Sequence, residues 1–464
     1  MGVTLLKRLL QSSAKQSQYL ACISAAIAGF TAGIHLGWPG PSLRKILSPE
    51  YPHDVTSDEA SYVAIISCIG HVIGGFSGSA LSDIIGRKYT LLAVGLPQIA
   101  SFLLIYVSYH GILLLYWARV IGGIGEGAMV AVLPMYMAEV SSADIRGSIG
   151  TLSVLVSLFG CLFINVLGSY TDIHTAALIC LVFPLLHWAC FIHFPDTPYY
   201  YLMKSKPGKA RDSLRTLRAT QEVDKEILAL TSDVARQMSE SGKYRDLFII
   251  DSNRKAFILM TAARLFQMFT GTAAFLNYYQ ILIEQTTSLS PVFGSSLILL
   301  TQIVMTSLSS KVIDNFGRKW MLSVSSASTC LVLFVLAVYF TIKDYTGLDV
   351  SSVDWFPLPM MVLFVVTFFI GLGVALPIIV SEIYSTSIKT KAVSLGSVVF
   401  ASSMMTSTKF YQYSADNFGL AVPFYTFAAS TFLGTLFFLY KLPETKGKTL
   451  EMIQQELKGK QQEG

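Results

Sequence analysis

The sequence predicts an all-α membrane protein in which twelve transmembrane helices form two six-helix pseudo-repeats. Of its 464 residues, 53% are hydrophobic and only 14% are charged, whereas about a quarter of the residues of a soluble protein are charged. The apolar residues gather in stretches of about 20, which is the length that a helix needs to cross a bilayer. The phrase Asp83-Ile84-Ile85-Gly86-Arg87-Lys88 returns half a chain later as Asp314-Asn315-Phe316-Gly317-Arg318-Lys319. A repeated charged loop between apolar stretches indicates a duplicated membrane unit.

The apolar stretches divide into six on each side of one long polar segment. Three of them, 112–137, 255–284 and 357–381, are long enough to tilt or to overrun the membrane. The others are 19–39, 60–81, 89–109, 148–169, 175–194, 290–312, 320–342, 391–413 and 420–440.

The distribution of basic residues predicts the orientation. With the N-terminus in the cytoplasm, most basic residues of the short loops fall inside, and few fall outside. This asymmetry is typical of cytoplasmic loops, so we expect both termini to be cytoplasmic and the protein to lie in the plasma membrane. The inside residues are Arg87, Lys88, Arg146, Arg318, Lys319, Lys389, Lys391, Lys441, Lys446 and Lys448.

The polar segment between the two sets of helices has loosely helical apolar spacing. We therefore expect a cytoplasmic helical linker at 196–254 with two or three short amphipathic helices; a flexible linker is the alternative. The expected bundles are 1–195 and 255–440, followed by a cytoplasmic tail at 441–464.

Several classes of protein are not expected. The six cysteines lie scattered in apolar stretches without paired spacing, which argues against a disulfide framework or a metal site. The chain carries no Walker loop and no catalytic Ser/His/Asp order, so we expect neither an enzyme nor a cofactor. Its net charge of +5 belongs to membrane-facing loops and indicates no nucleic-acid partner.

Further phrases lie in a fixed order beside the repeated loop. They are Arg119 with Gly122-Gly123, Pro134-Met135-Tyr136 with Glu139-Val140 and Arg146-Gly147, Pro195-Asp196-Thr197-Pro198, and Pro443-Glu444-Thr445-Lys446-Gly447. Across nearly all of the chain, this set resembles the sugar-porter family of the major facilitator superfamily, and most closely its insect branch of facilitated trehalose and hexose transporters. The resemblance implies the major facilitator fold and transport of a small solute, which we expect to be a sugar, by a protein that we expect to be monomeric.

Charges at the inner membrane boundary are costly unless they are paired. We therefore expect two ion-pair clusters at the cytoplasmic face, which the resemblance implies hold that side shut when the cavity opens outward. The alternative is that the charges only orient the helices, although this would not require the acids. The first cluster comprises Asp83, Arg87, Arg119, Glu139 and Arg146, and the second comprises Asp314, Arg318, Glu382 and Lys389.

The resemblance also implies a sugar site near the middle of the membrane, built from neutral amides. Gln267 and Tyr278 match family positions, Gln302 stands where the family usually has Asn, and Asn277 replaces an aromatic residue. For each amide, helix packing is the alternative to substrate contact. Several family positions have become apolar, and loss of polar groups weakens selectivity for a polyol. These departures are Val154, Met268 and Ala273, together with a missing Trp in span 10.

Four ionisable residues stand out within the predicted spans: His71, Glu126, Arg264 and Lys409. Such residues are functional candidates by default, and Arg264 or Lys409 is suited to attracting an anionic solute. The alternative is that one of these two pairs with Glu126, or that Lys409 reaches the interface.

Mechanism follows from the predicted architecture. We expect alternating access by rocking of the two bundles about a central site. Proton-coupled relatives carry an Asp in the first span, and here 30–38 contains no acid, so facilitated diffusion is favoured. Proton coupling through Glu126 and His71, transport of another solute, and a non-transporting sensor remain the alternatives.

Overall fold

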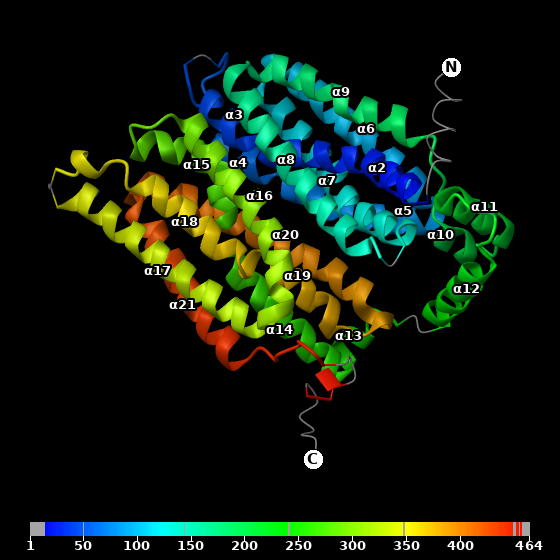
Figure 1. Ribbon diagram of the computed structural model, residues 1–464. Coiled ribbons are helices and arrows are strands. Elements are labelled where there is room, and N and C mark those ends of the chain that lie inside the picture. The colour runs from blue at the N-terminus through cyan, green and yellow to red at the C-terminus, as the bar shows by residue number, and fades with distance from the viewer. Residues whose placement is uncertain are drawn as a thin grey trace. The chain divides into compact units, whose positions relative to one another are not determined.

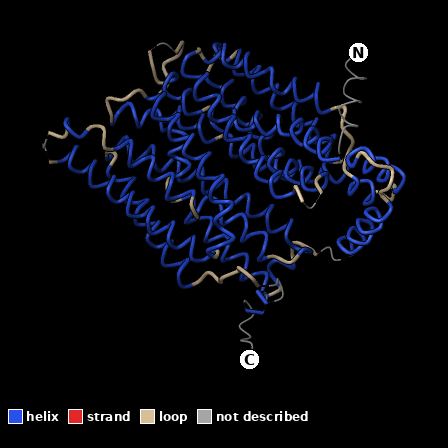
Figure 2. The backbone as a smooth tube through the Cα atoms, in the orientation of Figure 1, coloured by secondary structure: helices blue, strands red, loops and turns tan. Residues whose placement is uncertain are grey.

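The computed structural model describes residues 14–49, 51–142, 144–239, 242–346, 349–448, 452–453 and 455–456, without the side chains of a few helical residues. Most residues in these ranges are helical, and the ranges contain no strand (Figure 2). One helix or two consecutive helices cover each of the twelve expected spans, so the predicted helical class is confirmed.

The first six spans are formed by helices α2 to α9 (Figure 1). The first two spans are each built from two consecutive helices. The elements are α2 (Ala14–Gly37), α3 (Pro39–Ile46), α4 (Ser57–Ile65), α5 (Ser67–Ile85), α6 (Arg87–Tyr106), the short 3-10 helix η1 (Ser108–His110), α7 (Ile112–Val140), α8 (Arg146–Tyr170) and α9 (Ile173–Phe191).

The polar segment between the spans is helical, with more helices than expected. It forms α10 (Pro198–Met203), α11 (Pro207–Arg218), α12 (Asp224–Ser239) and α13 (Asp246–Ile249). Ala210, Leu214, Val223 and Ile227 are buried among α10 to α12. This small apolar cluster explains why a segment rich in charge is folded rather than extended.

The last six spans are formed by helices α14 to α21. The seventh and tenth spans are each broken into two helices, and α17 and α21 lie side by side (Figure 1). The elements are α14 (Asp251–Met268), α15 (Thr272–Thr286), α16 (Pro291–Phe316), α17 (Arg318–Tyr345), the 3-10 helix η2 (Ser351–Val353), α18 (Pro357–Phe369), α19 (Leu372–Ile383), α20 (Thr386–Phe418) and α21 (Ala421–Tyr440).

Ten of the twelve spans meet criteria of length and apolar composition for crossing a membrane. The α14–α15 pair and α20 do not, although each is long enough to cross when taken as one segment. Both contain buried polar side chains, among them Gln267, Asn277, Gln280 and Thr408. Within the described ranges, the two spans that do not meet the criteria therefore both lie in the second half of the chain.

The chain forms two compact units. Unit 1 contains Met1–Leu36, Ile69–Phe163 and Thr171–Ser241, and unit 2 contains Gly37–Cys68, Ile164–Tyr170 and Gly242–Gly464. Unit 2 includes α3 and α4 because α3 packs against α15 and α4 packs against α20. Within each unit, we call the helix ends beside the Gly86 or Gly317 turn the basic end, and the other helix ends the opposite end.

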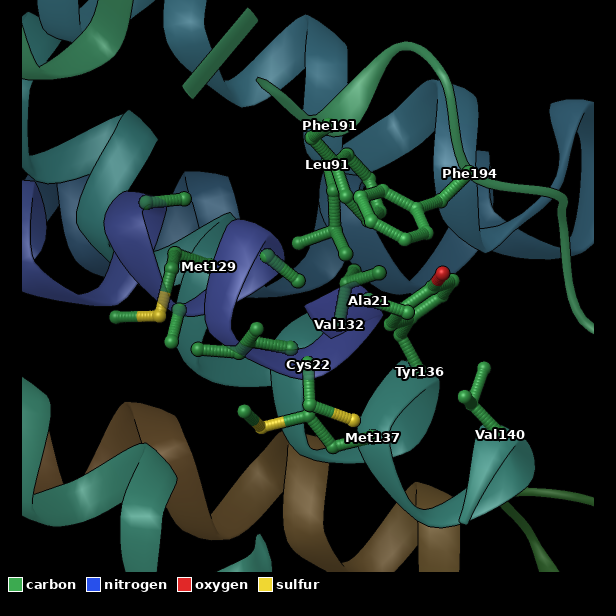
Figure 3. Packing of buried hydrophobic residues seen from close by; sticks show 14 of the residues in the cluster. Ala21, Cys22, Leu91, Met129, Val132, Tyr136, Met137, Val140, Phe191 and Phe194 are labelled. Atoms are coloured by element: carbon green, nitrogen blue, oxygen red, sulfur yellow. The ribbon is translucent and has the colours of Figure 1, made fainter. Parts of the chain in front are cut away.

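In unit 1, α6 packs between α7 and α9, and α5 approaches α7 through glycines. A Cβ atom on Gly74 would lie 2.0 Å from the carbonyl oxygen of Ile124, so the two backbones touch. Figure 3 shows the apolar core near the basic end, where Tyr136 packs edge-on against Phe191 with ring centroids 5.0 Å apart. This core holds the ends of α6, α7 and α9 in register for the charged residues described next.

Candidate functional site

The basic end of unit 1 carries a buried ion-pair cluster around Arg87. Its guanidinium donates to Glu139 at 3.2 Å, to Asp83 at 3.3 Å and to the carbonyl oxygen of Ser82 at 3.1 Å. The Arg87 side chain is only 3% exposed, and that of Glu139 13%. Removing one member of a buried pair leaves an uncompensated charge, so this contact firmly ties the start of α6 to the end of α7.

The Pro-Asp-Thr phrase after α9 completes this cluster. Thr197 donates its hydroxyl to the second oxygen of Glu139 at 2.5 Å, and Asp196 accepts the backbone N–H groups of Lys88 and Thr197 at 3.1 and 2.8 Å. A Cβ atom on Gly86, whose φ is +99°, would lie 1.9 Å from an Asp196 carboxylate oxygen. Glycine is therefore required here both by its φ and by the carboxylate at the start of α6.

Unit 2 repeats the arrangement with its own residues. Arg318 donates to Glu382 at 3.1 Å, and Thr445 donates its hydroxyl to the other Glu382 oxygen at 2.6 Å. Glu444 accepts the backbone N–H groups of Arg318 and Lys319 at 3.0 and 3.1 Å, beside the Gly317 turn with φ of +84°. Each unit thus joins an Arg, a Glu and a Thr, and places an acid at a helix start, where the helix dipole favours negative charge.

The roles of Asp196, Thr197, Glu444 and Thr445 were not predicted from the sequence. The signal was present, because Pro-acid-Thr occurs after span 6 and again after span 12, at 195–197 and 443–445. Each Pro-acid-Thr phrase follows the half of the chain that contains one copy of the Asp-x-x-Gly-Arg-Lys loop, and this parallel predicts that the phrase contacts the loop.

The two acids differ in their electrostatics. Burial raises the pKa of Asp196 above its ordinary value, against the hydrogen bonds from the backbone of Lys88 and Thr197. Burial also acts to raise the pKa of Glu444, but the backbone N–H groups of Lys446, Arg318, Lys319 and Thr445 outweigh it, so the pKa is lowered. Glu444 is therefore a stabilised carboxylate, whereas Asp196 is ionised at some cost.

Two residues expected in the first cluster lie elsewhere. Arg119 is near the start of α7, about 30 Å from Glu139 along the helix at 1.5 Å per residue, and it donates to the carbonyl oxygen of His35 at 2.7 Å. Its expected place in the cluster is wrong, because the sequence motif was assigned to the wrong end of the span. Arg146 is exposed and reaches the carbonyl oxygen of Ser141 at 3.5 Å, so it too lies outside this cluster in the present conformation.

The second cluster is described in part. The side chain of Asp314 lies outside the described part of the chain. Lys389 lies in the first turn of α20 and interacts electrostatically with Glu382.

Gln267 joins the breaks in the seventh and tenth spans. It lies in the last turn of α14, just before the Gly271 break, and is 4% exposed. Its amide nitrogen donates to the carbonyl oxygen of Leu372 at 2.6 Å, where α19 begins after its own break. Its amide oxygen accepts from Arg264 at 2.8 Å. Broken helices expose backbone polar groups at membrane depth and are typical of transporter binding sites.

The other predicted substrate contacts lie in α15 and α16. The amide nitrogen of Asn277 and the hydroxyl of Tyr278 are buried, and neither has a hydrogen-bond partner among the described residues. The Tyr278 ring lies 5.4 Å from that of Tyr411 in α20. Gln302 is half-buried in the middle of α16.

A buried amide network lies nearer the opposite end of unit 2, and it was not predicted. Gln280 donates to Asn165 at 2.7 Å and to Ser169 at 2.8 Å, while Ser295 donates to Asn165 and Asn165 donates to Ser296, both at 3.1 Å. Asn165, Gln280 and Ser295 are each at most 1% exposed. Their signal in the sequence was an amide in span 5 and a third amide in span 7, after Gln267 and Asn277.

The four ionisable residues of the spans have partners or neighbours in the structure. His71 and Glu126 form one pair, with 3.3 Å between Nδ1 and Oε1, so neither Arg264 nor Lys409 pairs with Glu126. Lys409 binds Asp58 and donates to Ser61 at 2.7 Å. Arg264 donates to Gln267 and lies over the Phe400 ring at 5.6 Å.

Comparison with known proteins gives the same picture over most of the chain. The family described as "Sugar (and other) transporter" matches residues 19–457. The Bombyx mori "Facilitated trehalose transporter Tret1" is 28% identical over 446 residues, which cover 95% of this chain and 87% of that protein. The Drosophila mojavensis protein of the same name is 28% identical over 450 residues, which cover 96% of this chain but about half (52%) of that protein.

Solved structures support the fold. An inward open conformation of the xylose transporter XylE from E. coli has a TM-score of 0.79 at 18% identity, covering 94% of this chain and 99% of that chain. A partially occluded inward open conformation of the same protein has a TM-score of 0.77, covering 93% and 99%. The twelve-helix major facilitator fold is thereby confirmed.

Proposed function

The chain belongs to the sugar (and other) transporter family, and from this premise we propose that it carries a neutral sugar across a membrane by facilitated diffusion. The observation that carries this proposal is the position of Gln267. A buried neutral amide joins two broken helices there, and α15 carries a further buried amide, Asn277. Neutral donors and acceptors at helix breaks suit a polyol, whose hydroxyl groups both donate and accept.

We propose trehalose or a hexose as the substrate. The insect relatives are named for trehalose transport, and the bacterial neighbours for xylose. Gln267, Asn277, Gln302 and Tyr278 are the proposed contacts. Asn277 and Tyr278 fit this role because each is buried with a polar atom that makes no hydrogen bond among the described residues.

Transport would proceed by alternating access of the two bundles 1–195 and 255–440. The Arg87–Glu139 and Arg318–Glu382 clusters would brace the basic end, which faces the cytoplasm if the charge asymmetry of the loops sets the orientation. We place the protein in the plasma membrane as a monomer with both termini cytoplasmic, acting as a transporter rather than an enzyme.

The test is flux into proteoliposomes that contain only this protein and internal buffer. Labelled trehalose and glucose are expected to equilibrate across the bilayer, with saturation and with no accumulation above the outside concentration. Absence of flux across a broad panel of mono- and disaccharides would reject a sugar as the substrate.

An anionic solute is the second candidate, favoured by Arg264. Its guanidinium is hydrogen-bonded to Gln267 and lies over Phe400, and it has no carboxylate partner within the described ranges. A thermal-shift panel that includes organic anions beside sugars separates the two candidates, because only the transported class should stabilise the protein.

Proton-coupled sugar symport is the third candidate, favoured by the His71–Glu126 pair in unit 1. Imidazole and carboxylate groups both bind and release protons, which is the chemistry that proton coupling requires. Symport would show as accumulation of sugar driven by an inward proton gradient, which facilitated diffusion does not produce.

A further inference from the structure

One face of α15 forms a polar ladder that runs from the helix break toward the opposite end. Asn277, Gln280 and Glu284 follow one another at three and four residues, so they lie on one side of the helix. Glu284, near the end of the helix, accepts two hydrogen bonds from Arg44, both at 2.7 Å. Between that ion pair and the helix break, the ladder consists of two neutral amides.

Gln280, the amide nearer the opposite end, is hydrogen-bonded to α8. Its amide nitrogen is shared between the Asn165 amide oxygen and the Ser169 hydroxyl, and Asn165 also accepts from Ser295 of α16. Asn165 is five residues from the end of α8 at Tyr170, and Ser295 is four residues from the start of α16 at Pro291. Three helices therefore meet through neutral polar groups, of which Asn165, Gln280 and Ser295 are buried.

The lower amide, Asn277, lies one turn deeper on the same face. Its nitrogen is buried and makes no hydrogen bond among the described residues. On α16, Ser295 and Gln302 are separated by seven residues and so lie on one face, with Gln302 two turns deeper. The closed Gln280–Asn165 contact is thus directly outward of two of the proposed sugar contacts.

We propose that Asn165 and Gln280, with Ser169 and Ser295, form a second sugar subsite that is closed on itself in this conformation. Its ligand class is a neutral polyol, which would be bound here when the opposite end opens and then passed to Asn277 and Gln302. This inference rests on the proposed sugar transport and deepens it by naming a separate outer site.

The chemistry of the network favours this role over simple packing. A helix contact inside a membrane needs no amides, and buried polar groups are costly unless every one is satisfied. When α8 separates from α15, Asn165 and Gln280 lose each other as partners. Sugar hydroxyl groups can replace both partners at once, because each hydroxyl donates one hydrogen bond and accepts others.

The test compares external half-saturation concentrations for uptake into cells that lack other sugar carriers. Gln280→Met and Asn165→Leu remove the amides and keep the approximate side-chain shape. If these amides bind sugar from outside, each variant should raise the external half-saturation concentration about fivefold, since one hydrogen bond contributes about that factor. If the network is only a latch, its loss makes the opposite end easier to open, so the same concentration falls, and that result overturns the proposal.

A series of deoxy-sugars gives a second readout that a latch would not move. The native protein should prefer the intact sugar over at least one deoxy analogue by about fivefold. Gln280→Met should abolish the preference against that analogue and leave the preferences against the other analogues unchanged. Unchanged preferences in both variants would overturn the subsite. Gln285→Met, at an exposed position of the same helix, is the control and should match the native protein.

Three further outcomes have different consequences. Should the apolar variants fail to reach the membrane, Gln280→Asn keeps a polar group but withdraws it by one methylene, and it should raise the external half-saturation concentration in the same direction. Native protein that moves no sugar at all would reject the proposed function and the subsite together. If the native protein transports sugar and the variants have the native half-saturation concentration, the subsite is rejected and the proposed sugar transport stands.

Discussion

The side-chain amide of Gln267 donates to the carbonyl oxygen of Leu372, so one hydrogen bond joins the broken seventh span to the broken tenth. Leu372 is the first residue of α19, where the tenth span resumes after its break. Gln267 binds the backbone at this break with its amide nitrogen and accepts from Arg264 with its amide oxygen. Its position is therefore held from both sides, as expected for a group that must meet a substrate in a defined geometry.

Replacing this amide should slow transport. Gln267→Ala removes a proposed sugar contact and the hydrogen bond that joins the two broken spans, so we expect initial sugar uptake to fall about tenfold at equal surface expression. Uptake of labelled sugar into proteoliposomes measures the effect. Gln285→Ala, on an exposed part of α15, should leave uptake near the native level, and a native rate in Gln267→Ala would remove this residue from the site.

The helices were predictable from the sequence, and the contacts between their ends were only partly so. A run of apolar residues specifies a span whatever its neighbours are, which is why the predicted stretch 148–169 closely matches α8 at Arg146–Tyr170. A motif does not by itself specify which helix end it occupies. Arg119 was placed at the wrong end of α7 because its phrase was read without counting the rise along the helix.

The polar network at Asn165 and Gln280 shows a second limit. A resemblance to a family directs attention to the positions where the family has amides, and here Val154 and Ala273 are apolar. The buried amides lie two to three helical turns nearer the opposite end on the same spans. Only the packing of α8 against α15 and α16 reveals that these residues meet.

Both duplicated threonines should stabilise the protein, and Thr197 also caps the start of α10 by accepting from the backbone N–H of Tyr200 at 3.2 Å. Thr197→Val and Thr445→Val each remove a hydroxyl donor from a carboxylate that also pairs with an Arg, and valine preserves the shape of the side chain. Hydrogen bonds to charged groups contribute about 1.5–3 kcal/mol, so both variants should unfold at lower temperature than the native protein in the same detergent. The control is Thr151→Val, which removes only an exposed hydroxyl bonded within its own helix. If its unfolding temperature falls by the same amount, the hydrogen bonds of the two clusters do not specifically stabilise the protein.

The acids at the two helix starts should respond to pH in opposite directions. The pKa of Glu444 is lowered in the folded protein, so its stabilising effect is complete above the ordinary glutamate value and is lost as pH falls through the folded pKa. The pKa of Asp196 is raised, so its ionisation lowers stability as pH rises from the ordinary aspartate value to the folded pKa.

Thermal unfolding of Glu444→Gln and Asp196→Asn across this acidic range measures both effects. The deficit of Glu444→Gln relative to native protein should shrink on acidification. Asp196→Asn should instead gain relative to native protein as pH rises toward neutrality. If the unfolding temperatures of the two variants, each relative to native protein, change with pH in the same direction, the opposite pKa shifts of Glu444 and Asp196 are contradicted.

Proton gradients should not drive uptake if the protein is a facilitator. With an inward proton gradient across proteoliposomes, internal sugar is expected to rise only to the external concentration. Glu126→Gln should retain this equilibrating flux, although it breaks the pair with His71. Accumulation above the external level in native protein, abolished in Glu126→Gln, would instead establish symport through this pair.

The ion pair between Arg44 and Glu284 ties α3 to α15 at the opposite end of unit 2. Both side chains are more than one-third exposed, so the pair contributes at most about 1 kcal/mol. Glu284→Arg replaces attraction with repulsion and should favour separation of these helices. The external half-saturation concentration for sugar should then fall by up to about fivefold, opposite in sign to the rise expected when Gln280 is lost.

The double variant Arg44→Glu with Glu284→Arg restores a pair of reversed polarity and should return the external half-saturation concentration toward the native value. High salt should weaken the native pair and reproduce part of the single variant's effect. If the reversed pair fails to rescue Glu284→Arg, the effect of that substitution comes from altered packing of α15 and not from the charge.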